Sequence, residues 1–152
     1  MQRFCLSMLI IVASLQVLAQ NCFDFHKINC CPLQADSYTQ YAVSSNSTSF
    51  ALKPGDSRCI VYQIFSGKDY RLTICSDSLY SGIVSFQIRD DNNNVLYDNS
   101  EEDFNPFFEF SCRKTTHVEF VISAPNRSDV VPETKGCIGL LIEEAITPRL
   151  GF

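Results

Sequence analysis

The chain has 152 residues, enough for one domain with its own hydrophobic core, and a formal net charge of −5 at pH 7. This acidic balance, without any cluster of Lys or Arg, argues against nucleic acids and anionic membrane surfaces as partners.

Residues 1–19 have the layout of a secretory signal peptide. Arg3 precedes an apolar run over residues 4–12, and the segment ends in Val17-Leu18-Ala19. The apolar run is too short to cross the ~30 Å of hydrocarbon in a membrane. Two residues separate the expected cleavage site from Cys22, so we expect no lipid anchor. The sequence predicts a protein that is secreted, periplasmic or on the cell surface, with no membrane insertion after the signal is cleaved.

Residues 20–49 form the least regular part of the chain. We expect an extended N-terminal arm here, with a polar surface loop or linker over residues 44–49.

From Phe50 onward, short runs with alternating apolar and polar residues are separated by turn signals. Seven such runs predict strands, at residues 59–65, 70–75, 83–90, 95–97, 107–112, 118–122 and 137–143. No helical periodicity competes with this pattern, and proline stays out of the middle of the runs. The sequence predicts an all-β fold, an antiparallel β-sandwich of jelly-roll-like form with about seven to eight strands. It would span residues 50–145 and be followed by a tail over residues 146–152.

Seven of the eight cysteines follow residue 19, and in an exported protein disulfides are their default role. The chain has no Cys-x-x-Cys pair and only two histidines, which disfavours a structural metal site. The disulfide candidates are Cys22, Cys30, Cys31, Cys59, Cys75 and Cys137.

We consider three pairings. Cys22 could bond Cys30 or Cys31 within the arm. Cys75 and Cys137 both lie on the outward face of their strands, so they could pair if those strands are neighbours. Cys59 could tether the arm, whereas Cys112 shares a face with Phe108 and Phe110 and is expected in the core. The odd number leaves one thiol free or bonded between chains.

A resemblance covers about half of the chain, from Gly67 to Glu143. The segments Gly67–Cys75, Val84–Asp90, Val95–Asn99, Phe108–Phe110 and Gly136–Ile142 follow one another in the order seen in a group of small secreted β-sandwich proteins of Bacteroidota, which the chain resembles. More distantly, the chain is similar to the pre-peptidase C-terminal β-sandwich domain, an accessory module of secreted peptidases. Neither resemblance brings catalytic residues to this chain.

One loop has the residue types of a calcium site. Asp90, Asn92, Asn94, Asp98 and Glu101 occupy positions 1, 3, 5, 9 and 12 of a calcium-loop template. Val95 stands where the template needs Gly, and the flanking segments are predicted strands instead of helices. A hairpin turn rich in Asp and Asn explains the same residues better. The alternative is a looser calcium site formed by Asp90, Asp91 and a cluster of Asp98, Glu101, Glu102 and Asp103, and we expect no other cofactor.

No catalytic constellation is evident. His26 and His117 have no nucleophile elbow or His-Glu-x-x-His motif beside them. Phe104, Phe107 and Phe108 beside Pro106 are expected to pack in the core, with an exposed binding patch as the alternative.

We therefore predict a non-enzymatic binding or structural module of the cell envelope or extracellular space, with an unknown protein or glycan partner. The alternative is an accessory or inhibitory partner of a secreted hydrolase. A hydrolase using either histidine is the least favoured function.

Overall fold

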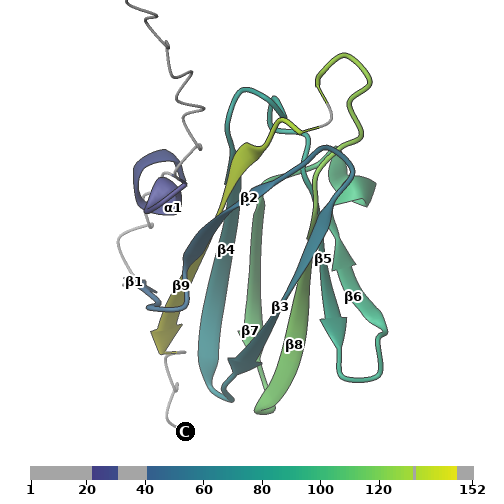
Figure 1. Cartoon of the computed structure of the whole chain (residues 1–152). Helices are drawn as coiled ribbons and strands as arrows, with labels where there is room; N and C mark the ends of the chain where they lie inside the picture. Colours follow the sequence, from purple (N-terminus) through teal and green to yellow (C-terminus); the bar gives the residue numbers. More distant parts are fainter. Residues whose placement is uncertain (1–21, 31–40, 132, 147–152) are drawn as a thin grey trace, which may run out of the picture.

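Two antiparallel sheets lie face to face in the computed structural model, which describes residues 22–30, 41–131 and 133–146 (Figure 1). One sheet contains β1 (Ala42–Val43), β2 (Thr48–Leu52), β9 (Gly136–Ile146), β4 (Lys68–Ser76) and β7 (Phe107–Cys112). The other contains β3 (Ser57–Ile64), β8 (Thr116–Ser123), β5 (Ser85–Asp90) and β6 (Val95–Asp98). Two short helices are present, α1 (Phe25–Asn29) and the 3-10 helix η1 (Asn99–Glu102). The predicted all-β sandwich is confirmed. The expected signal peptide and residues 147–152 of the expected tail lie outside the described residues.

The strands pair in a nested order. β2 pairs with β9, β3 with β8, β4 with β7, and β5 with β6, all antiparallel. This is the order produced when one long hairpin is wrapped into two sheets, which is the jelly roll. The seven predicted strands correspond to β3 through β9. The expected start of the sandwich at Phe50 falls inside β2, and β1 lies in the stretch expected to be an arm.

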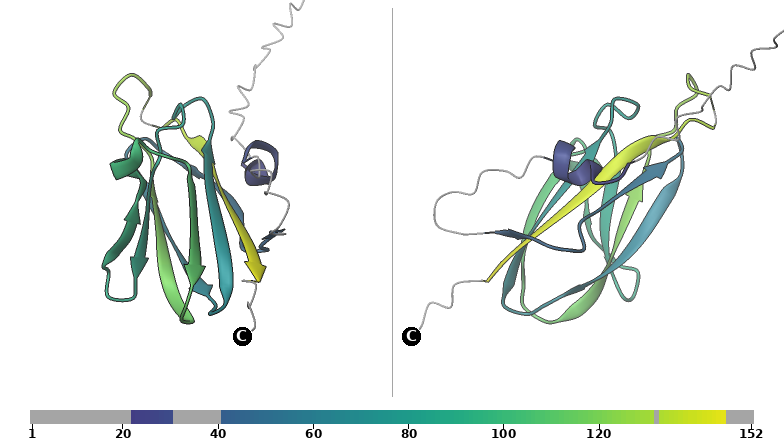
Figure 2. Two further views of the ribbon diagram at one scale, coloured as in Figure 1. Left: turned by 180° about the vertical axis from the view of Figure 1, so that it is seen from behind. Right: turned by 60° about the vertical axis from the view of Figure 1, so that its left-hand side comes forward.

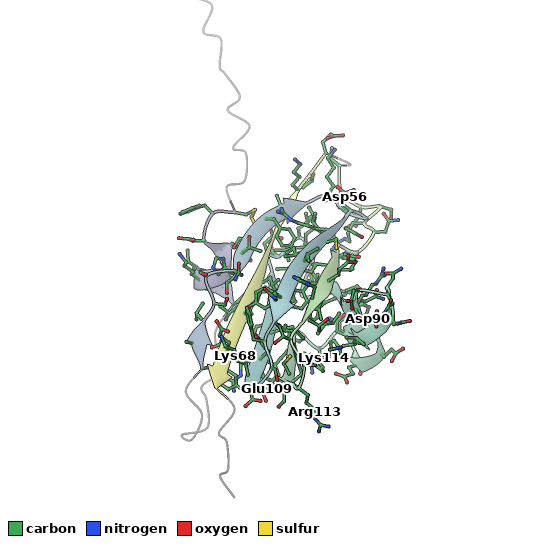
Figure 3. The ribbon with its side chains drawn as sticks, turned by 90° about the horizontal axis from the view of Figure 1, so that it is seen from below. Asp56, Lys68, Asp90, Glu109, Arg113 and Lys114 are labelled. Atoms are coloured by element: carbon green, nitrogen blue, oxygen red, sulfur yellow. A yellow bond between two sulfur atoms is a disulfide. The ribbon has the colours of Figure 1, made fainter. Side chains whose placement is uncertain are left out.

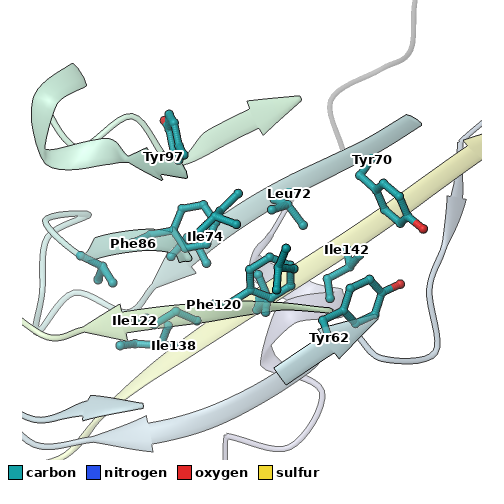
Figure 4. Close-up of a cluster of buried hydrophobic side chains, with 14 of the residues drawn as sticks. Tyr62, Tyr70, Leu72, Ile74, Phe86, Tyr97, Phe120, Ile122, Ile138 and Ile142 are labelled. Atoms are coloured by element: carbon teal, nitrogen blue, oxygen red, sulfur yellow. The ribbon is translucent and has the colours of Figure 1, made fainter. Parts of the chain in front are cut away.

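Period-two alternation fills the space between the sheets with apolar side chains. Leu72 and Ile74 of β4, Phe120 and Ile122 of β8, and Ile138 of β9 are among the buried residues (Figure 4). Seven described aromatic rings form a closed chain of contacts, with centroids 3.7 to 6.2 Å apart: Tyr62, Tyr70, Phe110, Phe108, Tyr97, Phe86 and Phe120. Such edge-to-face and offset contacts add to the stabilisation from burial.

Helix α1 lies against the outer face of the first sheet (Figure 2). Two disulfides that flank the helix fasten it there, Cys22–Cys137 and Cys30–Cys75. The expected pairing of Cys22 with Cys30 or Cys31 is therefore wrong, and so is that of Cys75 with Cys137. Cys75 does lie outward on a strand next to Cys137, as expected, but its register partner on β9 is Gly139. Cys75 and Cys137 are thus diagonal neighbours about 7–8 Å apart, which is too far for a disulfide.

Gly139 makes room for this helix. A Cβ there would lie 2.7 Å from the Cys75 Sγ, 2.8 Å from the His26 Cα and 2.9 Å from the Cys30 Sγ. The Cys30–Cys75 disulfide and the helix backbone therefore depend on the missing side chain.

The remaining described cysteines carry free thiols. Cys59 is exposed on β3, so the expected tether to the arm is wrong, and Cys112 is buried as expected. Cys31 lies outside the described residues.

The two open sides of the sandwich, where the edge strands of the two sheets face each other, differ in how far contacts between the sheets cover them. On one side, β2 and the connection that precedes it contact β3: the Ser44 hydroxyl lies 3.3 Å from the Tyr62 hydroxyl, and the Arg58 guanidinium lies over the Phe50 ring of β2 at 4.7 Å. Residues 44–49, expected to be a surface loop or linker, therefore contact β3 through Ser44 and run into β2. On the other side, β6 and β7 are the outermost strands of their sheets.

Candidate functional site: an apolar cleft between β6 and β7

A cleft of about 310 Å³ opens on the side of the sandwich where β6 and β7 end their sheets. Its walls come from both sheets and are mostly apolar. They include Ile88, Leu96, Tyr97, Phe108, Phe110 and Val118. No Asp or Glu is among the described lining residues.

Strand β7 supplies the aromatic wall. Phe108, Phe110 and Cys112 alternate with exposed residues and point inward, yet the two phenylalanines are only partly buried. Phe108 stacks on Tyr97 at 3.7 Å between centroids, and Phe110 stacks on Tyr70 at 5.3 Å. Alternation along β7 directs Phe108 and Phe110 into the core. They remain partly accessible because β6, with four residues, is too short to cover them.

A β-bulge directs Leu96 toward the cleft. Ile88 pairs with Tyr97 and Arg89 pairs with Val95, so Leu96 is an extra residue between two registered pairs. A bulge interrupts the alternation of side chains, and bulges commonly re-aim a residue at a sheet edge. Leu96 lines the cleft although it is 59 % exposed. The bulge also makes β6 a poor template for another strand.

The floor of the cleft carries no charge at neutral pH. Burial raises the pKa of Tyr97 to about 12, assisted by the hydrogen bond that its hydroxyl donates to Glu102 at 3.0 Å. Burial likewise raises the pKa of Tyr70 to about 12; this residue does not line the cleft but stacks on Phe110.

One end of the cleft is cationic. Arg113 and Lys114, in the turn between β7 and β8, belong to the lining and lie at the end of the sandwich away from Asp56 (Figure 3). Both are exposed, and among the described residues no carboxylate forms an ion pair with either side chain.

Hydrogen bonds fix the backbone of this turn. The Cys112 thiol donates to the Lys114 carbonyl at 3.1 Å, and the Ser66 hydroxyl donates to the Arg113 carbonyl at 2.8 Å. The Ser66 amide donates to the Thr115 hydroxyl at 3.0 Å. The two cationic side chains therefore project from a rigid base beside the cleft.

Four of the candidate calcium residues, Asp90, Asp91, Asn92 and Asn94, lie at the hairpin turn between β5 and β6, whereas Asp98 ends β6 and Glu101 lies in η1. Asp90 accepts hydrogen bonds from the Asn92 amide at 2.9 Å and from the amide and side chain of Asn94, both at 2.8 Å. These bonds, led by the Asn94 side chain, lower the pKa of Asp90. Asp98 accepts hydrogen bonds from Ser100 instead, and Asp91 and Glu101 are exposed. In the described part of the chain, no three His, Cys, Asp or Glu residues come together as metal ligands, and calcium binding stays a prediction.

The two histidines lie apart. His26 is the buried residue of α1; its Nδ1 lies 2.6 Å from the Ser49 hydroxyl, and its amide donates to the same oxygen at 2.7 Å. Burial lowers the pKa of His26, and Lys27 adds to this effect. His117 is exposed on β8, opposite Gln63. His26 thus has a structural role, holding α1 against β2.

A polar cluster on the outer face of the first sheet was missed by the sequence analysis. Arg71 is buried between the rings of Tyr41, at 4.0 Å, and Phe107, at 5.7 Å, and its Nε donates to Glu109 at 2.7 Å. Glu143 is its register partner on β9 and is only 4 % exposed.

One oxygen of Glu143 is buried without a hydrogen-bond partner among the described residues. Burial raises the pKa of Glu143, Arg71 opposes that shift, and Glu109 adds to it. Arg71 and Glu143 become neighbours only through the register of β4 against β9, which the sequence alone does not give.

The expected aromatic cluster is divided among three places. Phe108 faces the cleft, Phe107 lies near Arg71, and Phe104 and Pro106 line a separate hollow of about 240 Å³. The prediction that these four side chains pack in the core is not fully confirmed for any of them, because each is partly or largely exposed.

Comparisons with known proteins give little further guidance. No protein-family model matches the chain, and no curated protein matches it. Among solved structures, the chain is similar to the crystal structure of Aeromonas hydrophila PliG, a periplasmic lysozyme inhibitor of g-type lysozyme. The similarity covers 76% of this chain and 93% of that chain, at a TM-score of 0.45 and 10% sequence identity. Within the described residues, no helix is long and apolar enough to span a membrane.

Proposed function

We propose that this protein is an exported, non-enzymatic binding protein whose ligand occupies the cleft between β6 and β7. The observation that carries the proposal is the partial exposure of Phe108 and Phe110 on the inner face of β7. A purely structural sandwich gains stability by covering such rings, whereas a binding site uses them as contact area. Concave, mostly apolar sites with a few polar groups at the edge are typical of ligand binding.

The two disulfides support the export part of the proposal. Disulfides form and persist in oxidising compartments and are rare in the cytosol. Here they fasten the N-terminal segment to the sheet, as in a protein built for use outside the cytoplasm.

The binding part is tested with N-phenyl-1-naphthylamine, a neutral apolar dye whose fluorescence rises in apolar surroundings. We expect saturable binding to the wild-type protein. Leu96→Glu should weaken it about tenfold or more, because a charge next to the apolar walls loses its hydration when the dye binds.

Val95→Glu is the matched control. Val95 is the neighbouring residue, is exposed to a similar degree (52 %) and does not line the cleft. Its substitution should leave dye affinity unchanged, and thermal unfolding should show that both variants fold. Absence of saturable dye binding, or equal loss in the two variants, contradicts the proposal.

A further inference from the structure

We infer that the ligand of the cleft is a small amphipathic anion, with an apolar body against Leu96, Phe108 and Phe110 and an anionic group held by Arg113 and Lys114. This inference rests on the proposed function and specifies the chemistry of the ligand.

The volume of the cleft limits the size of the ligand. At about 310 Å³ it lies at the lower end of the ~300–1,000 Å³ that small-molecule sites occupy. An aromatic or short acyl body fills such a space. A polypeptide segment needs a longer groove, and the bulge at Leu96 disfavours strand addition along β6.

The charge around the cleft specifies the polar end of the ligand. The chain is acidic overall, and five of its described cationic side chains are already in ion pairs: Lys27, Lys53, Lys68, Arg71 and Arg127. Arg113 and Lys114 are adjacent, share the rim of the cleft and have no such partner among the described residues. No carboxylate belongs to the described lining, so Arg113 and Lys114 are the charged groups that an anion at this end contacts directly. Charge-assisted hydrogen bonds from Arg and Lys are among the stronger polar contacts in proteins.

The rigidity of the turn favours the same ligand. The thiol of Cys112 and the hydroxyl of Ser66 hold the carbonyls of Lys114 and Arg113, so the backbone needs no reordering when an anion binds. Preorganisation of this kind lowers the entropic cost of binding.

The test compares two dyes that differ by one anionic group. These are N-phenyl-1-naphthylamine, which is neutral, and 8-anilinonaphthalene-1-sulfonate, which has the same rings and a sulfonate. In low salt the wild-type protein should bind the sulfonate dye about tenfold more tightly, in line with one hydrogen bond to a charged group. Added salt should reduce this preference because it screens exposed charges.

Variants that remove a positive charge then show which side chains cause the preference for the sulfonate dye. Lys114→Gln should reduce it, and the double variant R113Q/K114Q should abolish it, while the affinity for the neutral dye is retained. Lys135→Gln is the control, because it removes an exposed lysine just before β9, outside the cleft lining, and should change neither affinity.

The outcomes separate the two proposals. If wild-type protein binds the neutral dye at the cleft but shows no preference for the sulfonate dye, the anionic ligand is wrong and the binding site stands. A preference that survives in R113Q/K114Q also overturns the anionic ligand. If neither dye binds, the proposed function fails as well.

Discussion

Replacing Cys22 and Cys137 by alanine removes a bond that closes a sequence separation of 115 residues, and replacing Cys30 and Cys75 removes one that closes 45 residues. The loss of loop-closure entropy in the unfolded chain gives about 5 kcal/mol for the first bond and about 4 kcal/mol for the second. Measured values are usually about 2–4 kcal/mol, and a domain of this size has a total stability of about 5–15 kcal/mol. Either pair of substitutions should therefore weaken the fold strongly, and loss of both bonds should leave it marginal or unfolded.

The assay is urea unfolding followed by far-ultraviolet circular dichroism, with and without reductant. We expect each double variant to lose about 2–4 kcal/mol of unfolding free energy, and the reduced wild-type protein to lose most of its stability. Cys59→Ser is the control, since this thiol is free and exposed, and it should change stability little. A loss below about 1 kcal/mol for either double variant would show that fastening α1 does not stabilise the sandwich.

Three further predictions concern single side chains. Gly139→Ala should cost about 1–3 kcal/mol in urea unfolding, because its Cβ would lie 2.7 Å from the Cys75 Sγ beside the helix backbone; an unchanged midpoint would contradict the close docking of α1. Asn99→Ala should cost about 2 kcal/mol or more, because the buried Asn99 Oδ1 accepts the Phe86 amide hydrogen bond at 2.7 Å and that amide would lose its partner; a loss near zero would contradict this role. Burial raises the pKa of Glu143 above its ordinary value of 4.5, so the folded state binds the Glu143 proton more tightly than the unfolded state does. The free energy of unfolding therefore falls as the pH rises from 4.5 through the pKa of Glu143 in the folded state. Glu143→Gln should therefore stabilise the protein at neutral pH, with a gain that disappears near pH 4, and a gain independent of pH would refute this explanation.

The sandwich was predictable because alternation is a local signal. Runs such as Tyr70–Cys75 carry their buried face in the sequence, and the same parity placed Cys75 and Cys137 outward. β1 and β2 were missed because β1 has only two residues, β2 begins with the polar Thr48 and Ser49, and the hydrogen-bond partners of both strands lie on β9, far along the chain. Such strands are stabilised by tertiary pairing and not by their own propensity.

The candidate site depended on information that no local pattern contains. Leu96 reaches the cleft only because of the bulge opposite Arg89, and parity alone would have placed it on the other face. The disulfides depended on the register that sets Cys75 opposite Gly139, and on the way α1 packs there. The adjacent Arg113 and Lys114 were visible in the sequence, but their position beside the rings of β7 was not.

The most direct measurement of the binding site is a set of intermolecular nuclear Overhauser effects between N-phenyl-1-naphthylamine and isotope-labelled protein. We expect contacts from the dye to the Leu96 methyl groups and to the Phe108 and Phe110 rings, with chemical-shift changes confined to β6, β7 and the turn at Arg113. Dye contacts at α1 or in the connection between β8 and β9, with none in the cleft, would contradict the assignment of the cleft as the binding site.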